Sequence, residues 1–229
     1  MSIDSFDLYL ENKNAFITAC ADVKRIKSDD VSSIERILIS MEKTWKTLVN
    51  EVPPLFQTDE KVWNKGNMPE DIKHFWLGLT SQEGVSQKRI KLSSGDTCYF
   101  YLVTPENKEL YNELKNSGGA MVQPELGLIF TLHENQFSIL HELGHIDFRI
   151  KSIYNTDNYK SMSPYMKYQH EEIHADNHAI ACWDQNKGDL KETLIERIRS
   201  FLDQWDFCTT VYHFPRVLNM WEKYKELIA

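Results

Sequence analysis

Apolar side chains recur at every third or fourth position over most of the chain, a spacing that predicts amphipathic helices. The predicted helices cover residues 4–27, 31–50, 69–79, 105–116, 135–152, 164–187, 190–207 and 215–228. Short apolar runs predict strands at 88–92, 97–103 and 127–132, with a hairpin turn at 93–96. Pro53 and Pro54 interrupt the pattern, so the segment to Gly66 is expected to be irregular. This order predicts an α+β fold, a small, mostly antiparallel sheet packed on helices.

The predicted helix after Asn135 carries two stripes of side chains, since successive residues are rotated by about 100°. One stripe contains Phe137, His141, His145 and Phe148, and the other contains Ile139, Leu143, Ile146 and Ile150. Such a helix crosses the middle of a domain, with one face on the core and the other lining a cleft. Asn135 is expected to cap it, and Gly144 to permit close approach by a neighbouring element.

Composition and charge narrow the class of protein. The 229 residues are 41% hydrophobic, as in a globular domain, and the formal charge of −8 argues against a nucleic-acid-binding body. No apolar run reaches the roughly 18 residues of a membrane span, and the acidic first residues do not resemble a secretory signal. The four cysteines lack C-x-x-C spacing. Reduced thiols in a cytoplasmic protein are therefore expected.

Residues 141–145 read His-Glu-Leu-Gly-His, the HExxH pattern. Two imidazoles four residues apart project from one face of a helix, so His141 and His145 are predicted to bind one Zn²⁺ ion. Glu142 lies at the edge of this histidine face. It is predicted to be the catalytic base that takes a proton from a water activated by the metal.

A third zinc ligand is expected on the helix that begins at Pro164. One of its stripes contains Tyr165, Tyr168, Glu172, Ala175, Asp176, Ala179 and Trp183. Two carboxylates in such a stripe are costly unless they are paired or bind metal. Glu172 is the predicted ligand, with Asp176 accepting from the free N–H of a ligand histidine; Glu171 and Asp176 are alternative ligands. A second row, formed by His170, His174 and His178, faces elsewhere and is expected to be solvated.

These motifs resemble the gluzincin type of zincin metallopeptidase, most of all the ImmA/IrrE group and the protease domains of plasmid anti-restriction proteins. Those families read F-[ST]-x-x-H-E-x-G-H and later E-E-x-x-A-[DEN], which match 137–145 and 171–176. The resemblance covers residues 126–183. It implies a zincin-like fold with HExxH on a central helix, His141, His145 and Glu172 as zinc ligands, and Glu142 as general base.

The resemblance also implies an activity. The expected protein is a zinc-dependent metallo-endopeptidase that cleaves a specific intracellular protein, such as a transcriptional regulator. One metallopeptidase domain is expected over 1–229, with a helical N-terminal lobe (1–66), a catalytic core (88–186) and C-terminal helices (189–229). The alternatives are a catalytically idle zincin scaffold that binds or inhibits a protein, and zinc hydrolysis of a small amide or ester. Oligomeric state stays open.

Two details of substrate handling stay open as well. An extended substrate could pair with strand 127–132 or 97–103, as in zincins generally, although burial of both faces explains the apolar 127–132 run equally well. The side chain that stabilises the oxyanion is expected among Tyr154, Tyr159, Tyr165, Tyr168 and His213.

Overall fold

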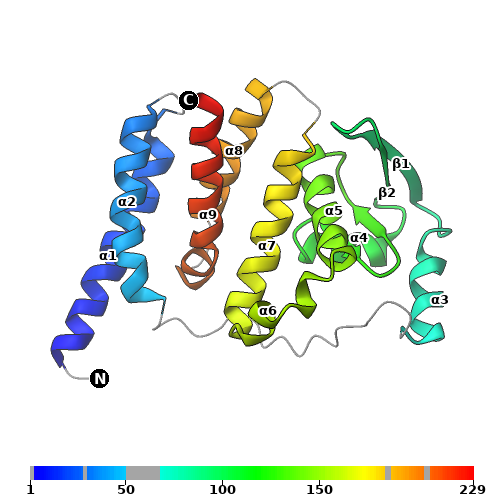
Figure 1. The fold of residues 1–229 in the computed structure, drawn as a ribbon, viewed down its shortest axis with the longest axis horizontal. Helices are drawn as coiled ribbons and strands as arrows, with labels where there is room; N and C mark the ends of the chain where they lie inside the picture. The colour runs from blue at the N-terminus through cyan, green and yellow to red at the C-terminus, as the bar shows by residue number, and fades with distance from the viewer. Residues whose placement is uncertain (1–2, 28–29, 50–67, 184–186, 204–206) are drawn as a thin grey trace. The chain divides into compact units, whose positions relative to one another are not determined.

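The computed structural model describes residues 3–27, 30–49, 68–183, 187–203 and 207–229 (Figure 1). The helices are α1 (Ile3–Arg25), α2 (Val31–Leu48), α3 (Glu70–Leu79), α4 (Lys108–Asn116), α5 (Gln136–Ile150), α6 (Asp157–Ser161), α7 (Pro164–Ala181), α8 (Lys187–Leu202), α9 (Phe207–Ile228) and a 3₁₀ turn, η1 (Ile153–Asn155). The strands are β1 (Val85–Lys91), β2 (Thr97–Val103), β3 (Ala120–Gln123) and β4 (Leu128–Thr131). The predicted irregular segment 53–66 lies outside the described residues. None of the described helices is long and apolar enough to cross a membrane.

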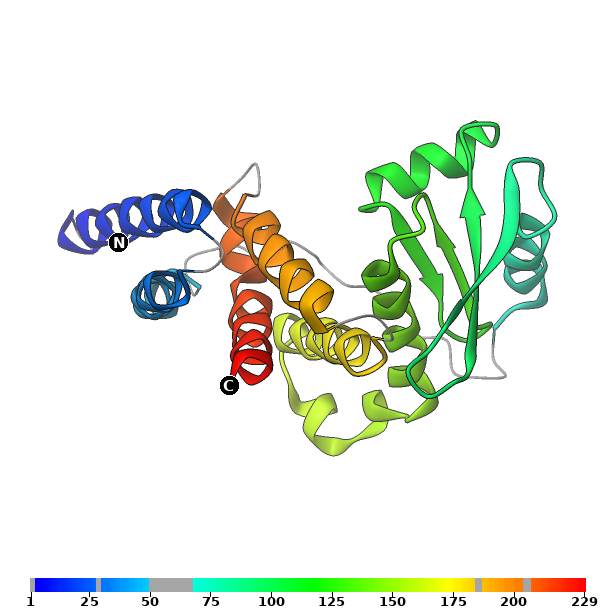
Figure 2. The same cartoon turned by 90° about the horizontal axis from the view of Figure 1, so that it is seen from above.

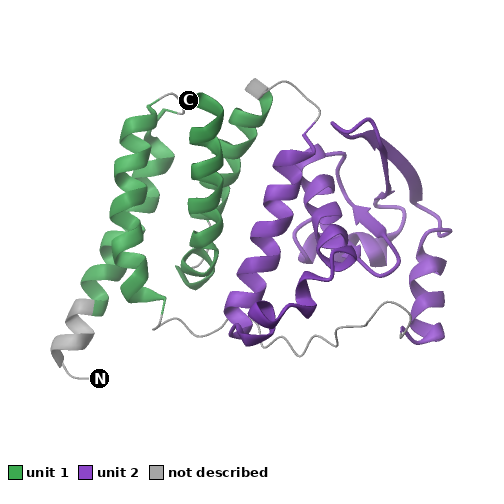
Figure 3. Cartoon of the chain, viewed as in Figure 1, with its two compact units in different colours: residues 1–57, 186–229 green, residues 58–185 purple. Residues whose placement is uncertain are grey.

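The chain forms two compact units (Figure 3). Residues 1–57 and 186–229 make the first, which contains α1, α2, α8 and α9, and residues 58–185 make the second. The N-terminal and C-terminal helices, expected as separate parts, therefore belong to the same unit. The sequence interpretation of 1–229 as one metallopeptidase domain stays a prediction.

In the first unit, α1 packs on α2 and α8, and α9 packs on α2 and α8. Aromatic rings meet in its core, where Phe16 contacts Phe214 edge to face with ring centroids 5.3 Å apart. Other buried apolar side chains of this unit include Val23, Ile34, Leu38, Met41, Leu48, Leu194, Ile198, Val217 and Met220. The helical apolar spacing of the sequence thus forms a helical bundle core.

Helix α9 corrects a boundary drawn from the sequence. Pro215 was expected to begin a helix, but α9 begins at Phe207 and continues through the proline. A proline has no N–H, so the carbonyl of Val211 loses its partner within the helix. The indole Nε1 of Trp45 donates to this carbonyl at 2.9 Å. A side chain from α2 therefore satisfies the group that the proline leaves open.

The second unit contains a sheet that, within the described residues, has four strands in the order β1-β2-β4-β3. The β1–β2 and β3–β4 pairs are antiparallel, whereas β2 and β4 are parallel. The predicted α+β class and small sheet are confirmed, and the sheet is mixed. The parallel pair needs a crossover, which runs through α4 and β3. Strand β3 was not predicted, because it spans only four residues between Gly119 and Pro124.

The two faces of the sheet carry different layers. On one face, a buried cluster joins the sheet to α3 and α4 through Leu79, Val103, Leu110, Leu114, Leu128 and Phe130. On the other face, a cluster joins the sheet to α5 through Cys98, Phe100, Ile129, Ile139 and Ile146. Figure 2 shows α5 between the sheet and α7. The HExxH helix therefore has the central place in its unit that the sequence predicted.

The two strands considered for pairing with an extended substrate, 97–103 and 127–132, are the inner strands of the sheet. These are β2 and β4, and each has a partner strand on both sides. All four residues of β4 are buried, because neighbouring side chains enter opposite clusters. Burial of both faces is thus the correct explanation of this apolar run. The edge strands of the sheet are β1 and β3.

Candidate metal centre

Two capped helices carry the candidate residues. The side chain of Asn135 accepts from the backbone N–H of Ser138 at 3.0 Å at the start of α5, as predicted. The hydroxyl of Ser163 does the same for Met166 at 3.3 Å, and Pro164 occupies the first turn of α7. Each cap fixes where its helix begins. The rotational position of every later side chain is set by that start.

The two predicted stripes of α5 face different neighbours. Phe137, His141, His145 and Phe148 are all buried. Ile139 and Ile146 pack against the sheet with Leu143, whereas Ile150, in the last turn, is 69% exposed. The stripe prediction is therefore confirmed except at the end of the helix.

A close approach of α5 and α7 brings the candidate residues together. An added Cβ at Gly144 would lie 2.5 Å from the Cα of Ala175 and 2.9 Å from its carbonyl oxygen. Both contacts are with backbone, which has no rotamer by which to move aside. Only glycine fits at this crossing, which agrees with the close approach that the sequence predicts at Gly144. The distance between the two helices therefore depends on this pair of small residues.

A Gly144→Ala substitution is expected to destabilise the protein by about 1–3 kcal/mol, as overpacking of a dense contact usually does. It should also weaken metal binding, because α7 must move away from α5. Gly78 in α3 is the matched control, since nothing lies within 4 Å of an added Cβ there. Gly78→Ala should instead stabilise by about 0.5–1 kcal/mol through helix propensity. Urea unfolding of both variants measures the difference; a neutral or stabilising Gly144→Ala would contradict the close approach.

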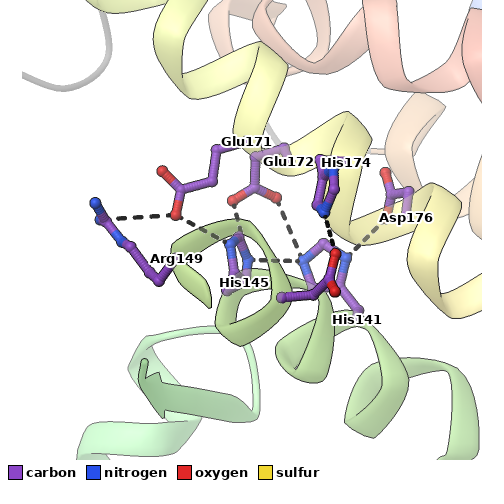
Figure 4. Close-up of polar contacts among 8 residues, drawn as sticks. His141, His145, Arg149, Glu171, Glu172, His174 and Asp176 are labelled. Carbon is purple, nitrogen blue, oxygen red and sulfur yellow. Dashed lines mark hydrogen bonds and ion pairs between the residues drawn. The ribbon is translucent and has the colours of Figure 1, made fainter. Parts of the chain in front are cut away.

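Three side chains from the two helices converge on one point (Figure 4). His141 Nε2 and His145 Nε2 lie 3.3 Å apart. The Glu172 carboxylate reaches both, with Oε2 at 3.5 Å from His141 Nε2 and Oε1 at 3.7 Å from His145 Nε2. These are the residues that the sequence predicted as zinc ligands. Among the described residues, they are the one group of His, Cys, Asp or Glu side chains that could hold a metal ion.

The separations suit a tetrahedral ion. Bonds of about 2.0–2.1 Å to zinc place neighbouring ligand atoms about 3.3 Å apart. The distances of 3.3, 3.5 and 3.7 Å are close to that value. Two imidazoles and one carboxylate form a donor set that zinc accepts, and they leave a fourth corner for water or substrate. The residues present therefore fit a tetrahedral ion such as Zn²⁺.

The far side of each imidazole also meets a carboxylate. His141 Nδ1 lies 2.9 Å from Asp176 Oδ1, so the histidine and the carboxylate that the sequence paired are within ion-pair distance. His145 Nδ1 lies 3.3 Å from Glu171 Oε1, and Glu171 also faces Arg149 Nη2 at 3.8 Å. An Nδ1–H that donates to a carboxylate leaves the Nε2 lone pair free for a metal. Both rings thus turn Nε2 towards the shared point.

The carboxylates make this centre attractive to a positive charge. Burial disfavours a charged His141, but the charges of Asp176 and Glu172 and their hydrogen bonds outweigh it and raise the pKa of His141 to about 9. Asp176 is fully buried. A buried carboxylate requires a compensating partner. The site is therefore suited to a cation between the three convergent side chains.

Glu142, the predicted base, is half-buried next to His141 on α5. Within the described part of the chain, no hydrogen bond or ion pair engages its carboxylate. Successive residues of a helix differ by about 100°, so Glu142 lies between the histidine stripe and the sheet-facing stripe. A carboxylate that is not committed to a structural contact is available to exchange a proton.

The prediction of a solvated row at His170, His174 and His178 is wrong. All three are half-buried, since α7 packs closely on α5. His174 Nε2 lies 2.9 Å from Asp147 Oδ2, and the ring of His170 contacts Phe148 edge to face. Burial lowers the pKa of His178. The row forms part of the contact between the helices.

The candidate oxyanion donors lie in different surroundings. The ring of Tyr154 lies 5.2 Å from the guanidinium carbon of Arg149, and Tyr159 packs edge to face on Phe148. Tyr165 and Tyr168 are half-buried on α7, whereas His213 belongs to α9 of the first unit. Tyr154 and Tyr159 thus have packing contacts. The structure assigns the donor role to none of the five.

No model of a protein family, no curated protein and no solved structure matches the chain. The zincin resemblance therefore rests on the motif residues. The geometry of those residues is the basis on which a function can be proposed.

Proposed function

We propose that the chain is a zinc-dependent peptidase. The proposal is supported above all by the convergence of His141, His145 and Glu172 on one point, with the unengaged carboxylate of Glu142 on the same turn of α5. A site that only stabilises a fold needs no base, and structural zinc sites use four protein ligands. The three-ligand arrangement with an adjacent acid favours hydrolysis.

The chain's own residues divide the work of amide hydrolysis. When bound, zinc supplies Lewis acidity, which activates water and polarises the scissile carbonyl. Glu142 accepts a proton from the attacking water while the oxygen of that water bonds to the carbonyl carbon. As the C–N bond breaks, Glu142 returns this proton to the departing amine nitrogen. His141, His145 and Glu172 would hold the metal, and Asp176 would fix the tautomer of His141.

Strand β3 is the part of the sheet that could align a substrate. It is an edge strand and packs against α5, the helix that carries the site. An extended peptide can add to such an edge through backbone hydrogen bonds. We therefore propose an extended protein segment as substrate. By the family resemblance, it belongs to a specific intracellular protein such as a transcriptional regulator.

Metal analysis and cleavage assays test the proposal together. The purified chain should contain zinc, and it should cut candidate proteins into defined fragments that a chelator abolishes and added zinc restores. Generic peptides serve as the comparison for specificity. A melting temperature that rises with a candidate protein, without any cleavage, would instead support the idle binding scaffold. A protein that binds no zinc at all would contradict the proposal.

A further inference from the structure

The carboxylate that faces Nδ1 of His145 has an additional partner, whereas the one that faces Nδ1 of His141 is a single buried carboxylate. Asp176 meets His141 as a single, fully buried carboxylate. Glu171 meets His145, but the same oxygen, Oε1, also faces Arg149 (Figure 4). The Arg149 guanidinium in turn lies against the ring of Tyr154. Contacts therefore connect Tyr154 in η1 to Arg149, Arg149 to Glu171, and Glu171 to His145, a candidate zinc ligand.

We propose that Glu171 and Arg149 are positioning residues for His145, with Arg149 acting through Glu171. This inference rests on the proposed zinc site. Glu171 accepts the Nδ1–H of His145, which keeps Nε2 directed at the metal. Arg149 holds the Glu171 carboxylate in the place where it can do so.

The need for Arg149 arises from the position of Glu171 in the sequence. Glu171 directly precedes Glu172, so two neighbouring carboxylates project from α7 near the proposed metal. Without a restraint, Glu171 could turn towards the metal and compete with Glu172 as a ligand. Its ion pair with Arg149 opposes that motion, because the cation lies on the Nδ1 side of His145. Arg149 thereby separates the roles of two adjacent acids.

Burial supports a defined geometry for this pair. The side chain of Arg149 is 14% exposed and that of Glu171 is 17% exposed, so solvent screens their attraction weakly. Within the described residues, Glu171 is the one carboxylate that pairs with Arg149. At 3.8 Å the two groups form an ion pair without a hydrogen bond, so Arg149 acts on Glu171 through weakly screened attraction. Lys151, two residues on, pairs with Asp147 instead and is 59% exposed.

A double-mutant cycle on zinc affinity tests the inference. The chains are the parent, Glu171→Ala, Arg149→Met and the double variant, each titrated with Zn²⁺ against a chromophoric chelator. Glu171→Ala should weaken zinc binding by about 10–100-fold, the usual effect of removing such a partner. Arg149→Met should weaken it by a smaller factor in the parent chain. In the Glu171→Ala background, Arg149→Met should have no further effect, because its route to His145 is already gone.

Two further variants separate positioning from general effects. Lys151→Met removes a positive charge from the same region without touching Glu171, and should leave zinc affinity within about twofold of the parent, as expected of an exposed pair. Glu171→Gln keeps an acceptor for His145 Nδ1 and should recover part of the affinity lost in Glu171→Ala. The Co²⁺ absorption spectrum should shift in Glu171→Ala and Arg149→Met but not in Lys151→Met. Melting of the metal-free variants shows which of them are folded.

The possible failures are distinguishable. If Arg149→Met weakens zinc binding equally in both backgrounds, Arg149 does not act through Glu171, and the inference is wrong while the zinc site stands. The same holds if the folded Glu171→Gln and Glu171→Ala variants both bind zinc like the parent. If the parent binds no zinc, the proposed function and this inference fall together.

Discussion

A Glu142→Gln variant is expected to bind zinc as tightly as the parent chain and to cleave protein substrate about 10²–10⁴-fold more slowly. Glutamine has nearly the shape of glutamate but cannot accept the proton of the attacking water. The carboxylate of Glu142 makes no hydrogen bond or ion pair with the described residues, so the exchange removes no structural contact. Zinc titration and single-turnover cleavage measure the two quantities separately.

Glu134→Gln is the matched control for this substitution. Glu134 is exposed and lies just before the N-terminal cap of α5, so the control makes the same change of charge outside the site. It should leave both zinc affinity and cleavage unchanged. Full activity in Glu142→Gln would remove Glu142 from the mechanism. A joint loss of zinc and of stability would instead show that the carboxylate has a structural role.

Sequence spacing is enough to predict which residues lie around the candidate metal position. The four-residue spacing of His141 and His145 fixes their common face on any regular helix. The stripe of α7 that contains Glu172 and Asp176 could be derived in the same way, and the structure brings both residues to the histidines. The sequence also predicts a close approach at Gly144, because small residues permit close helix packing, and the structure identifies Ala175 as the neighbour.

The residues that support the histidines from the Nδ1 side are harder to predict, because their contacts depend on how the two helices pack. Arg149 follows His145 by four residues, so it shares the histidine stripe, and this was the signal available for it. The sequence could not show that Glu171, rather than water, would meet it. The half-burial of His170, His174 and His178 was missed for the same reason, since the rotation of α7 against α5 is not encoded in either helix alone.

Errors in the fold arose where tertiary contacts override local rules. Pro215 usually marks the start of a helix, but the indole of Trp45, far away in the sequence, satisfies the carbonyl that the proline leaves without a partner. Strand β3 is too short for any periodicity, and its pairing with β4 defines it. The 97–103 strand, in contrast, has the predicted bounds, because its apolar run is long and flanked by a turn.

A Glu172→Ala variant is expected to lose zinc binding more severely than any substitution of an outer partner. It removes one of the three proposed ligands together with a negative charge, and two imidazoles alone hold zinc weakly. The loss of affinity should exceed the roughly 10–100-fold that removal of a supporting side chain costs. Thermal unfolding reports the same loss, since a ligand that binds the folded state at 100 times its Kd stabilises it by about 2.7 kcal/mol. Zinc should therefore raise the Tm of the parent chain and leave that of Glu172→Ala almost unchanged.

The neighbouring acids make this comparison decisive, because Glu171, Glu172 and Asp176 lie on the same helix and each contacts one or both histidines. Alanine at each position removes the same charge, so the order of zinc affinities identifies the ligand. The geometry predicts that Glu172→Ala has the largest effect, because the Glu172 carboxylate alone faces both Nε2 atoms, whereas the other two face Nδ1. If Glu172→Ala kept zinc while Glu171→Ala or Asp176→Ala released it, the third ligand would be that other acid. The metal would then lie on the Nδ1 side of an imidazole ring and not at the point where the two Nε2 atoms converge.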